Sequence, residues 1–230
     1  MNWAAISADD CVFELGCGDG RVAIEAARRG AAAFCVEKDL SLAAEAQSAF
    51  RAENLTAAQV IVGDLFDVNL AAANATVVFM FLTPSVNARL KPSLSLLQTG
   101  ARIISREYEI LGWPCGKRFR HSGALFLRWT LGEFDSAIAM QSPPPEVDDS
   151  LEGLAVEHQL DCAVEEELRE AEKRRSEGKG TIAARLEEQP ASESQDCGSG
   201  EDAGRSKLDV DEATSEHGRC DMSPVLSPDT

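Results

Sequence analysis

Short apolar runs alternate with longer amphipathic stretches over the first 110 residues of the chain. Five of the runs have the length of buried strands, and strands are predicted at 11–15, 32–37, 58–63, 76–82 and 101–110. Three helices are predicted between them, at 20–29, 41–53 and 85–97, with Ser41 as the cap of the second. Strands and helices that alternate through short connections predict a mostly parallel sheet that is covered on both faces.

The pattern changes after Trp113. Two further strand-like segments, KRFRH at 117–121 and ALFLRWTL at 124–131, are separated by Ser122 and Gly123, a pair that suits the tight turn of a β-hairpin. The sequence therefore predicts an antiparallel edge on the parallel sheet.

Charge divides the chain into two parts. The formal net charge is −17, but residues 1–140 carry 15 acidic and 13 basic side chains, whereas residues 141–230 carry 24 and 9. All aromatic residues lie before residue 135, so the acidic part lacks the apolar surface for a core of its own. We therefore predict a folded domain at 1–140, a proline-rich linker at 141–150 and a disordered, low-complexity acidic tail at 151–230. Residues 151–179 can form a charged helix, whose apolar positions are too sparse for a fixed docking site.

Composition disfavours several classes of function. A neutral domain with an acidic tail repels phosphate, so no nucleic-acid partner is expected. No apolar run approaches the length of a membrane span, and the N-terminus has no leader-like pattern. The seven cysteines and three histidines show no CxxC pair and no zinc spacing, so no metal site is expected. Cys11, Cys17 and Cys35 are predicted to be small buried thiols in a reducing, intracellular compartment.

One glycine-rich stretch, VFELGCGDGRV at 12–22, follows the first predicted strand and precedes the first helix. Its glycines let the backbone turn sharply and approach a ligand, and the amides of the following helix favour polar or anionic ligand groups. The spacing departs from the dinucleotide fingerprint, because Arg21 stands where a third glycine is needed. A nicotinamide-dependent oxidoreductase is therefore disfavoured, and no Tyr-x-x-x-Lys pair supports one.

Glu14, Gly16, Gly18 and Gly20 form the pattern E-x-G-x-G-x-G, which resembles the first motif of class I S-adenosylmethionine-dependent methyltransferases. The resemblance implies a Rossmann-like α/β sandwich, whose sheet ends in a reversed strand like the one predicted above. It implies S-adenosylmethionine as the cofactor, with the methionine portion against the glycine turn. Glu14 and Asp19 are then placed to orient the amino group of that portion.

Polar and aromatic residues also fall at the ends of the other predicted strands, where α/β sheets bind their ligands. Glu37 ends the second strand and is expected to accept hydrogen bonds from the ribose; a surface ion pair with Lys38 is the alternative. Asp64 ends the third strand and is expected to accept from the adenine amino group, with Leu65 over the ring; capping a short helix is its alternative role. Phe81, after the fourth strand, completes the expected cofactor site.

A narrower resemblance covers roughly residues 6–115. The segments ELGCGDGRVAIEAARRGA, GDLFDVNL and FLTPSVNARLKPSLSLLQTGARIIS, in this order, look like a small methyltransferase group. That group includes bacterial proteins and the mitochondrial protein-lysine methyltransferases of the ATP synthase c-subunit type. The resemblance implies methyl transfer to a lysine amine of a protein partner. The Leu-Thr-Pro-Ser-Val-Asn segment lies where class I enzymes line the acceptor pocket, which makes Thr83 and Asn87 candidates for contact with the acceptor.

Methyl transfer to an amine is an in-line displacement that needs alignment and an uncharged amine. Desolvation lowers the pKa of a lysine, and a nearby carboxylate can take its proton. Glu107 and Glu109 fall on one face of the fifth predicted strand. Glu107 is the candidate for this proton transfer, and two solvent-facing charges are the alternative.

Two features depart from the family pattern. The family has an aromatic-rich lid segment before the first strand, and its mitochondrial members carry an N-terminal membrane anchor; neither is found in this sequence. We therefore expect either a truncated gene model or a protein that has lost its lid, located in the cytoplasm or in mitochondria. The alternatives to lysine methylation are a small-molecule methyltransferase and a cofactor-binding module that has lost catalysis.

Overall fold

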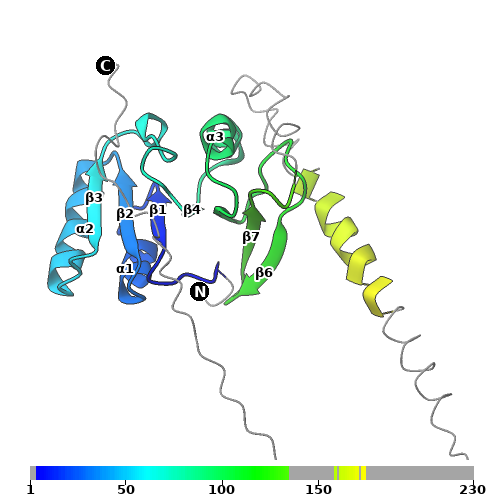
Figure 1. Cartoon of the computed structure of the whole chain (residues 1–230), viewed down its shortest axis with the longest axis horizontal. Coiled ribbons are helices and arrows are strands. Elements are labelled where there is room, and N and C mark those ends of the chain that lie inside the picture. Colours follow the sequence, from blue (N-terminus) through cyan, green and yellow to red (C-terminus); the bar gives the residue numbers. More distant parts are fainter. Residues whose placement is uncertain (1–3, 135–157, 160, 171, 175–230) are drawn as a thin grey trace, which may run out of the picture. The chain divides into compact units, whose positions relative to one another are not determined.

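The computed structural model of the chain describes residues 4–134, 158–159, 161–170 and 172–174. Residues 4–134 form a seven-stranded sheet with helices packed against it (Figure 1). The strands are β1 (Cys11–Leu15), β2 (Ala32–Glu37), β3 (Ala58–Val62), β4 (Val77–Met80), β5 (Arg102–Arg106), β6 (Lys117–His121) and β7 (Ala124–Thr130). The helices are α1 (Arg21–Arg28), α2 (Leu40–Ala52) and α3 (Pro84–Ser95), with a 3-10 turn, η2, at Leu65–Asp67.

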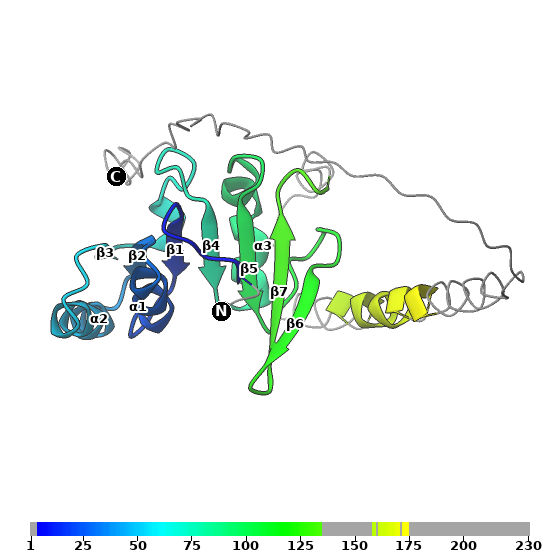
Figure 2. The ribbon, with the colours of Figure 1, turned by 60° about the horizontal axis from the view of Figure 1, so that its bottom comes forward.

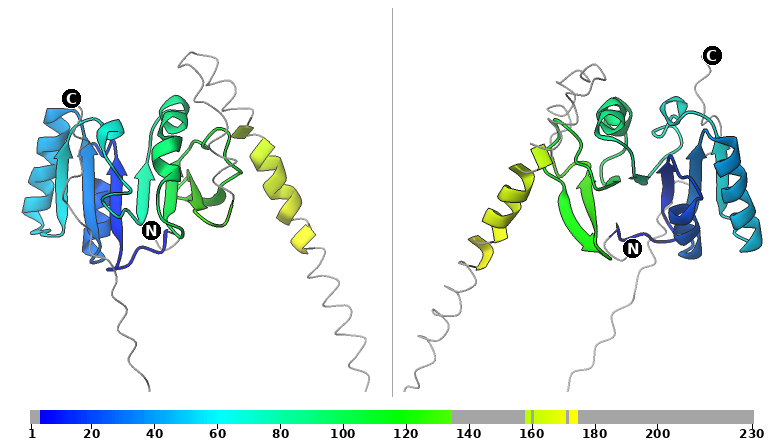
Figure 3. Two further views of the ribbon diagram at one scale, coloured as in Figure 1. Left: turned by 45° about the horizontal axis from the view of Figure 1, so that its top comes forward. Right: turned by 180° about the vertical axis from the view of Figure 1, so that it is seen from behind.

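The order of strands across the sheet is β3-β2-β1-β4-β5-β7-β6 (Figure 2). The first five of these strands are parallel, and β7 is antiparallel to both of its neighbours, β5 and β6. Ser122 and Gly123 join β6 to β7 with positive φ angles, as a tight hairpin turn requires. The hairpin forms the edge of the sheet away from α2 (Figure 3). The predicted mostly parallel sheet with an antiparallel edge is therefore confirmed.

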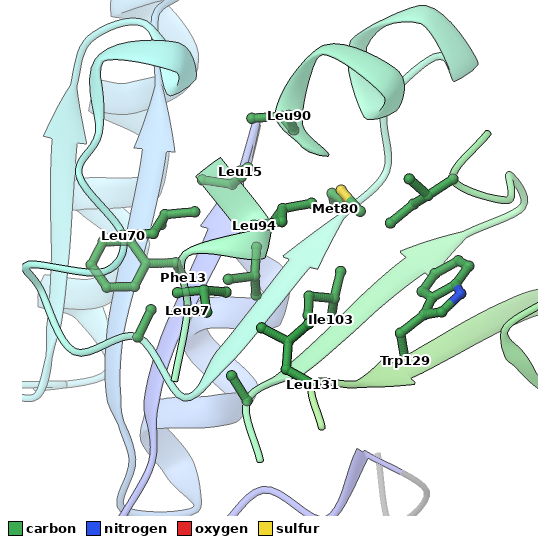
Figure 4. Packing of buried hydrophobic residues seen from close by; sticks show 14 of the residues in the cluster. Phe13, Leu15, Leu70, Met80, Leu90, Leu94, Leu97, Ile103, Trp129 and Leu131 are labelled. Carbon is green, nitrogen blue, oxygen red and sulfur yellow. The ribbon is translucent and has the colours of Figure 1, made fainter. Parts of the chain in front are cut away.

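The sheet is covered on both faces because alternate residues of its central strands point in opposite directions. On one face, Phe13 and Met80 pack in a cluster with Leu94 of α3 (Figure 4). On the other face, Val12 packs in a second cluster with the alanines of α1 and with Phe50 of α2. Strand β4 lies at the centre and is buried throughout, which explains its unbroken apolar sequence.

Several predicted boundaries differ from the structure by one or two residues, and two further differences bear on the site. The cap of α2 is Asp39 rather than Ser41: its carboxylate accepts hydrogen bonds from two backbone N–H groups of the first turn, at 2.8 and 3.0 Å. Strand β5 ends at Arg106 rather than at residue 110, because the φ of +69° at Glu107 leaves the extended region. Glu109 is therefore not on a strand face, and with 1% of its surface exposed it is not a solvent-facing charge.

The described residues between 158 and 174 are helical, as predicted for the charged segment 151–179. The first turn of this helix, however, belongs to the same compact unit as the sheet and contacts residues of that unit. Cys162 is 1% exposed and forms a disulfide with Cys115, and Gln159 Nε2 donates a hydrogen bond of 2.8 Å to the carbonyl of Glu107. The expectation of a helix without a docking site is wrong for this turn.

The linker predicted at 141–150 and the tail beyond residue 174 lie outside the described residues. The domain boundary at residue 140 therefore stays a prediction. Within the described part of the chain, none of the helices has both the length and the apolar character that crossing a membrane requires.

Candidate functional site

The glycine turn after β1 is held by hydrogen bonds to the end of β2. The N–H groups of Gly16 and Cys17 donate to the carbonyl of Val36, at 2.9 and 3.1 Å. The N–H of Gly18 donates to Oε2 of Glu37, at 2.9 Å. The three glycines of the turn have φ angles between 56° and 72°, a region that glycine enters without steric cost. Bare backbone is thereby fixed between the ends of two parallel strands.

Gly20 caps α1 and packs against α2. Its φ is +72°, and a Cβ at this position would lie 2.9 Å from Cε1 of Phe50. We therefore expect Gly20→Ala to lower the free energy of unfolding by about 2–3 kcal/mol, measured by urea denaturation. Gly100→Ala is the matched control, because Gly100 has a φ of +88° but open space around it. An equal loss of stability in both variants would contradict the packing argument.

Two cavities flank the glycine turn, and Gly16 lines both of them. The larger, which we call the turn cavity, has a volume of about 570 Å³ and is bounded by the turn, by Glu14 and by the ends of β4 and β5. The smaller, which we call the β2–β3 cavity, has a volume of about 190 Å³ and is bounded by Glu37, Asp64 and Leu65. The cofactor-site residues predicted from the strand ends therefore come together, divided between two adjoining spaces.

In the β2–β3 cavity, the carboxylate of Glu37 is almost fully buried, with 9% of the residue exposed. Its Oε2 accepts from Gly18 as described, and its Oε1 accepts from the N–H of Asp39 at 2.9 Å, so it is not a surface charge paired with Lys38. Asp64 Oδ1 accepts from the N–H of the second residue of η2 at 3.0 Å, so Asp64 caps that turn while also lining the cavity. Both carboxylates keep lone pairs for a ligand, because a carboxylate can accept about four hydrogen bonds.

In the turn cavity, two carboxylates differ in protonation. Glu14 is 5% exposed, and its Oε2 accepts from the N–H of Ala23 at 2.8 Å. Burial raises the pKa of Glu14 to about 8, so this carboxyl is largely protonated at neutral pH. The hydrogen bonds from Arg21, the closest of 2.5 Å, lower the pKa of Asp19, which therefore stays ionised. A buried neutral acid and an exposed anion thus line the same space.

One wall of the turn cavity is aromatic and includes Phe81, which the sequence predicts to lie in the cofactor site. Phe79, Phe81 and Phe126 line it together with Arg106, whose guanidinium carbon lies 4.5 Å from the centre of the Phe81 ring. Sequence reasoning missed Arg106 because it placed the end of β5 four residues later. The signal that could have found it is a charged residue at a strand end, the same signal that identified Glu37.

The three residues predicted to act on the acceptor lie outside both cavities in the described part of the chain. Thr83 caps α3, with its Oγ1 3.0 Å from the hydroxyl of Ser85. Asn87 is fully buried, and its Nδ2 donates to Ser105 Oγ at 3.2 Å. Glu107 Oε1 accepts a long hydrogen bond of 3.4 Å from a backbone N–H of β7. Their catalytic roles stay predictions.

Residues 14–117 match the family model of the ANTKMT methyltransferase domain. A protein-lysine N-methyltransferase from Saccharolobus islandicus is 41% identical to the chain over 114 residues, which cover 48% of this chain and 70% of that protein.

The chain belongs to the ANTKMT methyltransferase family.

A solved RNA methyltransferase from Salinibacter ruber, in complex with S-adenosyl-L-homocysteine, is similar to this methyltransferase at 29% sequence identity and a TM-score of 0.54. The similarity covers 64% of this chain and 92% of that one. It confirms the Rossmann-like class I methyltransferase fold and S-adenosylmethionine as the cofactor.

The residues of this methyltransferase fit S-adenosylmethionine. Gly16 lines both cavities, and a Cβ on it would lie 2.9 Å from Cδ2 of Leu82, which lines the β2–β3 cavity. Glu37 and Asp64 would hold the adenosine portion, and Glu14 would face the methionine portion across the turn. The bound cofactor would supply a methyl group activated by its sulfonium.

The cysteines of the methyltransferase correct one expectation. Cys11 is buried as predicted, at 2% exposure, but it is disulfide-bonded rather than a thiol. Cys17 and Cys35, predicted to be thiols, form a disulfide with their Cα atoms 5.3 Å apart. The glycine turn folds back over β2, and this brings together two side chains that are 18 residues apart in sequence. Sequence spacing alone does not reveal such a pair.

Proposed function

We propose that this methyltransferase transfers the methyl group of S-adenosylmethionine to the side-chain amine of a lysine in a protein. The observation that carries the proposal is the aromatic wall of the turn cavity, which we assign to the methyl acceptor. The similarity to a protein-lysine N-methyltransferase at 41% identity supports it, and the family match over residues 14–117 includes Phe79 and Phe81 of this wall.

The aromatic wall suits a lysine in two ways. A lysine that enters a space lined by Phe79, Phe81 and Phe126 loses hydration, which lowers its pKa and favours the uncharged, nucleophilic amine. The positive charge of Arg106 acts in the same direction. After transfer, the methylated ammonium can be stabilised by the faces of the rings. The chemistry then needs alignment of the amine with the methyl group more than a strong base.

Methylation of RNA is the second candidate, favoured by the similarity to the RNA methyltransferase from Salinibacter ruber. Two cations, Arg21 and Arg106, line the turn cavity and could contact a phosphate. Against it, the net charge of the chain is −17, which opposes the counterion release that drives binding to a phosphate backbone. We therefore retain the lysine proposal.

The test uses the full chain, S-adenosylmethionine with a trideuterated methyl group and a lysate of the source organism. After the reaction, the protein, RNA and small-molecule fractions are separated and analysed by mass spectrometry. We expect trideuteromethyl-lysine in the protein fraction, and none when Glu37→Gln replaces the unchanged chain. Label confined to nucleosides or to small molecules would overturn the lysine proposal. Label in no fraction would also overturn it, in favour of a cofactor-binding module that has lost catalysis.

A further inference from the structure

Four side chains with metal-binding atoms meet beside the start of β6. We call Glu109, Cys115, His158 and Cys162 the C115 cluster. One donor atom each from Glu109, His158 and Cys162 lies within 4.8 Å of the other two, and Cys115 is joined to Cys162 by the disulfide. Glu109 and Cys162 are each 1% exposed. The cluster thus combines two sulfurs, an imidazole and a carboxylate, with Cys115 and His158 partly exposed.

The spacing of these atoms suits a tetrahedral metal ion. His158 lies one helical turn before Cys162, and its Nε2 is 3.8 Å from the Cys162 sulfur. Zinc bonds of about 2.3 Å to sulfur and about 2.0 Å to nitrogen would place such a pair of donors roughly 3.5 Å apart. The Cα atoms of Cys115 and Cys162 are 5.3 Å apart, so rotation of the side chains can separate the sulfurs once the bond between them is reduced.

We propose that, when the Cys115–Cys162 disulfide is reduced, the C115 cluster binds one zinc ion through the two thiolates, the His158 imidazole and the Glu109 carboxylate. Two thiolates with an imidazole select zinc over magnesium or calcium, which prefer oxygen donors. The earlier expectation of no metal site rested on local spacing. Local spacing does not reveal the C115 cluster, because its first and last donors lie 53 residues apart in the sequence. The one local signal is a His-x-x-x-Cys pair.

Charge and hydrogen bonding support this assignment. Two thiolates and one carboxylate exceed the charge of a zinc ion by one negative unit. The guanidinium of Arg118 lies 3.0 Å from Oε1 of Glu109, and its side chain is 8% exposed, so it supplies the missing positive charge. The N–H of Gly116 donates to Oε2 of Glu109 at 3.1 Å and helps to orient the carboxylate. Such outer partners hold ligands in place around protein-bound metals.

Zinc binding first requires reduction of the disulfide, and a thiol reductant of the kind found inside cells can supply the electrons. Two monothiol molecules reduce the Cys115–Cys162 bond: each cysteine gains one hydrogen atom, and the two monothiols become joined in a new disulfide. Zinc then displaces one proton from each cysteine thiol. The disulfide and the zinc site are therefore alternative ways to hold the same two sulfurs.

Both the disulfide and the zinc site link the start of the helix described between residues 158 and 174 to the segment that follows β5. Gln159 already contacts this segment through the carbonyl of Glu107, and Arg118 Nη2 donates to the carbonyl of Gln159 at 2.9 Å. Arg106, the residue before Glu107, lines the turn cavity. The metal would thus stabilise the backbone next to the acceptor side of the site, whatever the acceptor is.

The test uses the full chain, reduced with a phosphine in metal-free buffer and titrated with Co²⁺ as a spectroscopic probe. We expect one cobalt ion per chain, a thiolate-to-cobalt charge-transfer band and displacement of the cobalt by Zn²⁺. His158→Ala is the main variant because His158 is partly exposed, so the variant is expected to fold. Its matched control is His121→Ala, an exposed histidine on β6.

We expect at least a tenfold weaker affinity for cobalt in His158→Ala and in Cys115→Ser, and no change in His121→Ala or in Cys17→Ser. Circular dichroism checks that each variant is folded. A reduced, folded chain that binds no cobalt would overturn the proposal. Equal binding by His158→Ala and His121→Ala would do so as well, because the metal would then lie elsewhere.

Discussion

Glu37→Gln is expected to weaken the binding of S-adenosylmethionine at least about 100-fold. The carboxylate would accept hydrogen bonds from the two ribose hydroxyls, and hydrogen bonds to a charged group contribute about 1.5–3 kcal/mol each. The same carboxylate holds the N–H groups of Gly18 and Asp39, so its loss also loosens the glycine turn. Isothermal titration calorimetry of the full chain measures the effect directly.

Glu53→Gln is the matched control for this experiment. Glu53 carries the same change of charge, but its carboxylate pairs with Arg28 on the surface, at 2.8 Å. We expect Glu53→Gln to bind S-adenosylmethionine as tightly as the unchanged chain. Equal affinities of the two variants would show that Glu37 has no part in binding. Thermal unfolding of Glu37→Gln without ligand then separates a lost contact from a lost fold.

Glu14→Gln is expected to stabilise the protein at alkaline pH. Burial raises the pKa of Glu14 from 4.5 to about 8, so between these values the folded chain keeps a proton that the unfolded chain has released. The stability from this group is therefore complete below pH 4.5 and is lost as the pH rises to 8. At about 1.4 kcal/mol per pH unit, the loss amounts to as much as ~5 kcal/mol. Glutamine carries no proton to lose and still offers an oxygen to the N–H of Ala23.

Chemical denaturation at pH 5 and pH 9 checks this prediction. The difference in the free energy of unfolding between Glu14→Gln and the unchanged chain should grow by several kcal/mol from pH 5 to pH 9. Glu25→Gln is the control, because hydrogen bonds from Arg29 lower the pKa of Glu25, so its linkage to folding falls below pH 5 and its effect should not change between pH 5 and pH 9. The prediction is falsified if the difference for Glu14→Gln does not depend on pH.

The cofactor side of the site could be predicted from the sequence because its signals are local. Gly16, Gly18 and Gly20 mark a turn by their spacing, and a turn between a buried strand and a helix has few possible shapes. Glu37 and Asp64 stand at the ends of apolar runs, and the topology of a parallel sheet then brings them to one edge. No contact between distant segments had to be known.

The acceptor side could not be predicted to the same degree, because its geometry depends on where β5 ends. The positive φ of Glu107 ends the strand. The run of apolar and charged residues around Glu107 gives no sequence signal for a positive φ. Asn87 was assigned to the acceptor by its motif, yet it faces Ser105 in the interior. The disulfides and the C115 cluster join residues from separate elements, so they depend on tertiary packing rather than on spacing.

Strand β7 lies antiparallel between β5 and β6, and this places a hairpin turn where its length can vary. Arg106, the last residue of β5, pairs with Phe126 near the start of β7, so the turn at Ser122 and Gly123 projects from the same edge as the glycine turn. A connection between parallel strands must continue into a crossover, but a hairpin tip can be lengthened by single residues at the modest entropic cost of a larger loop. Gly123 has open space around it. Natural or engineered variation at this tip can therefore change the surface near Phe126, which lines the turn cavity, while the glycine turn keeps its sequence.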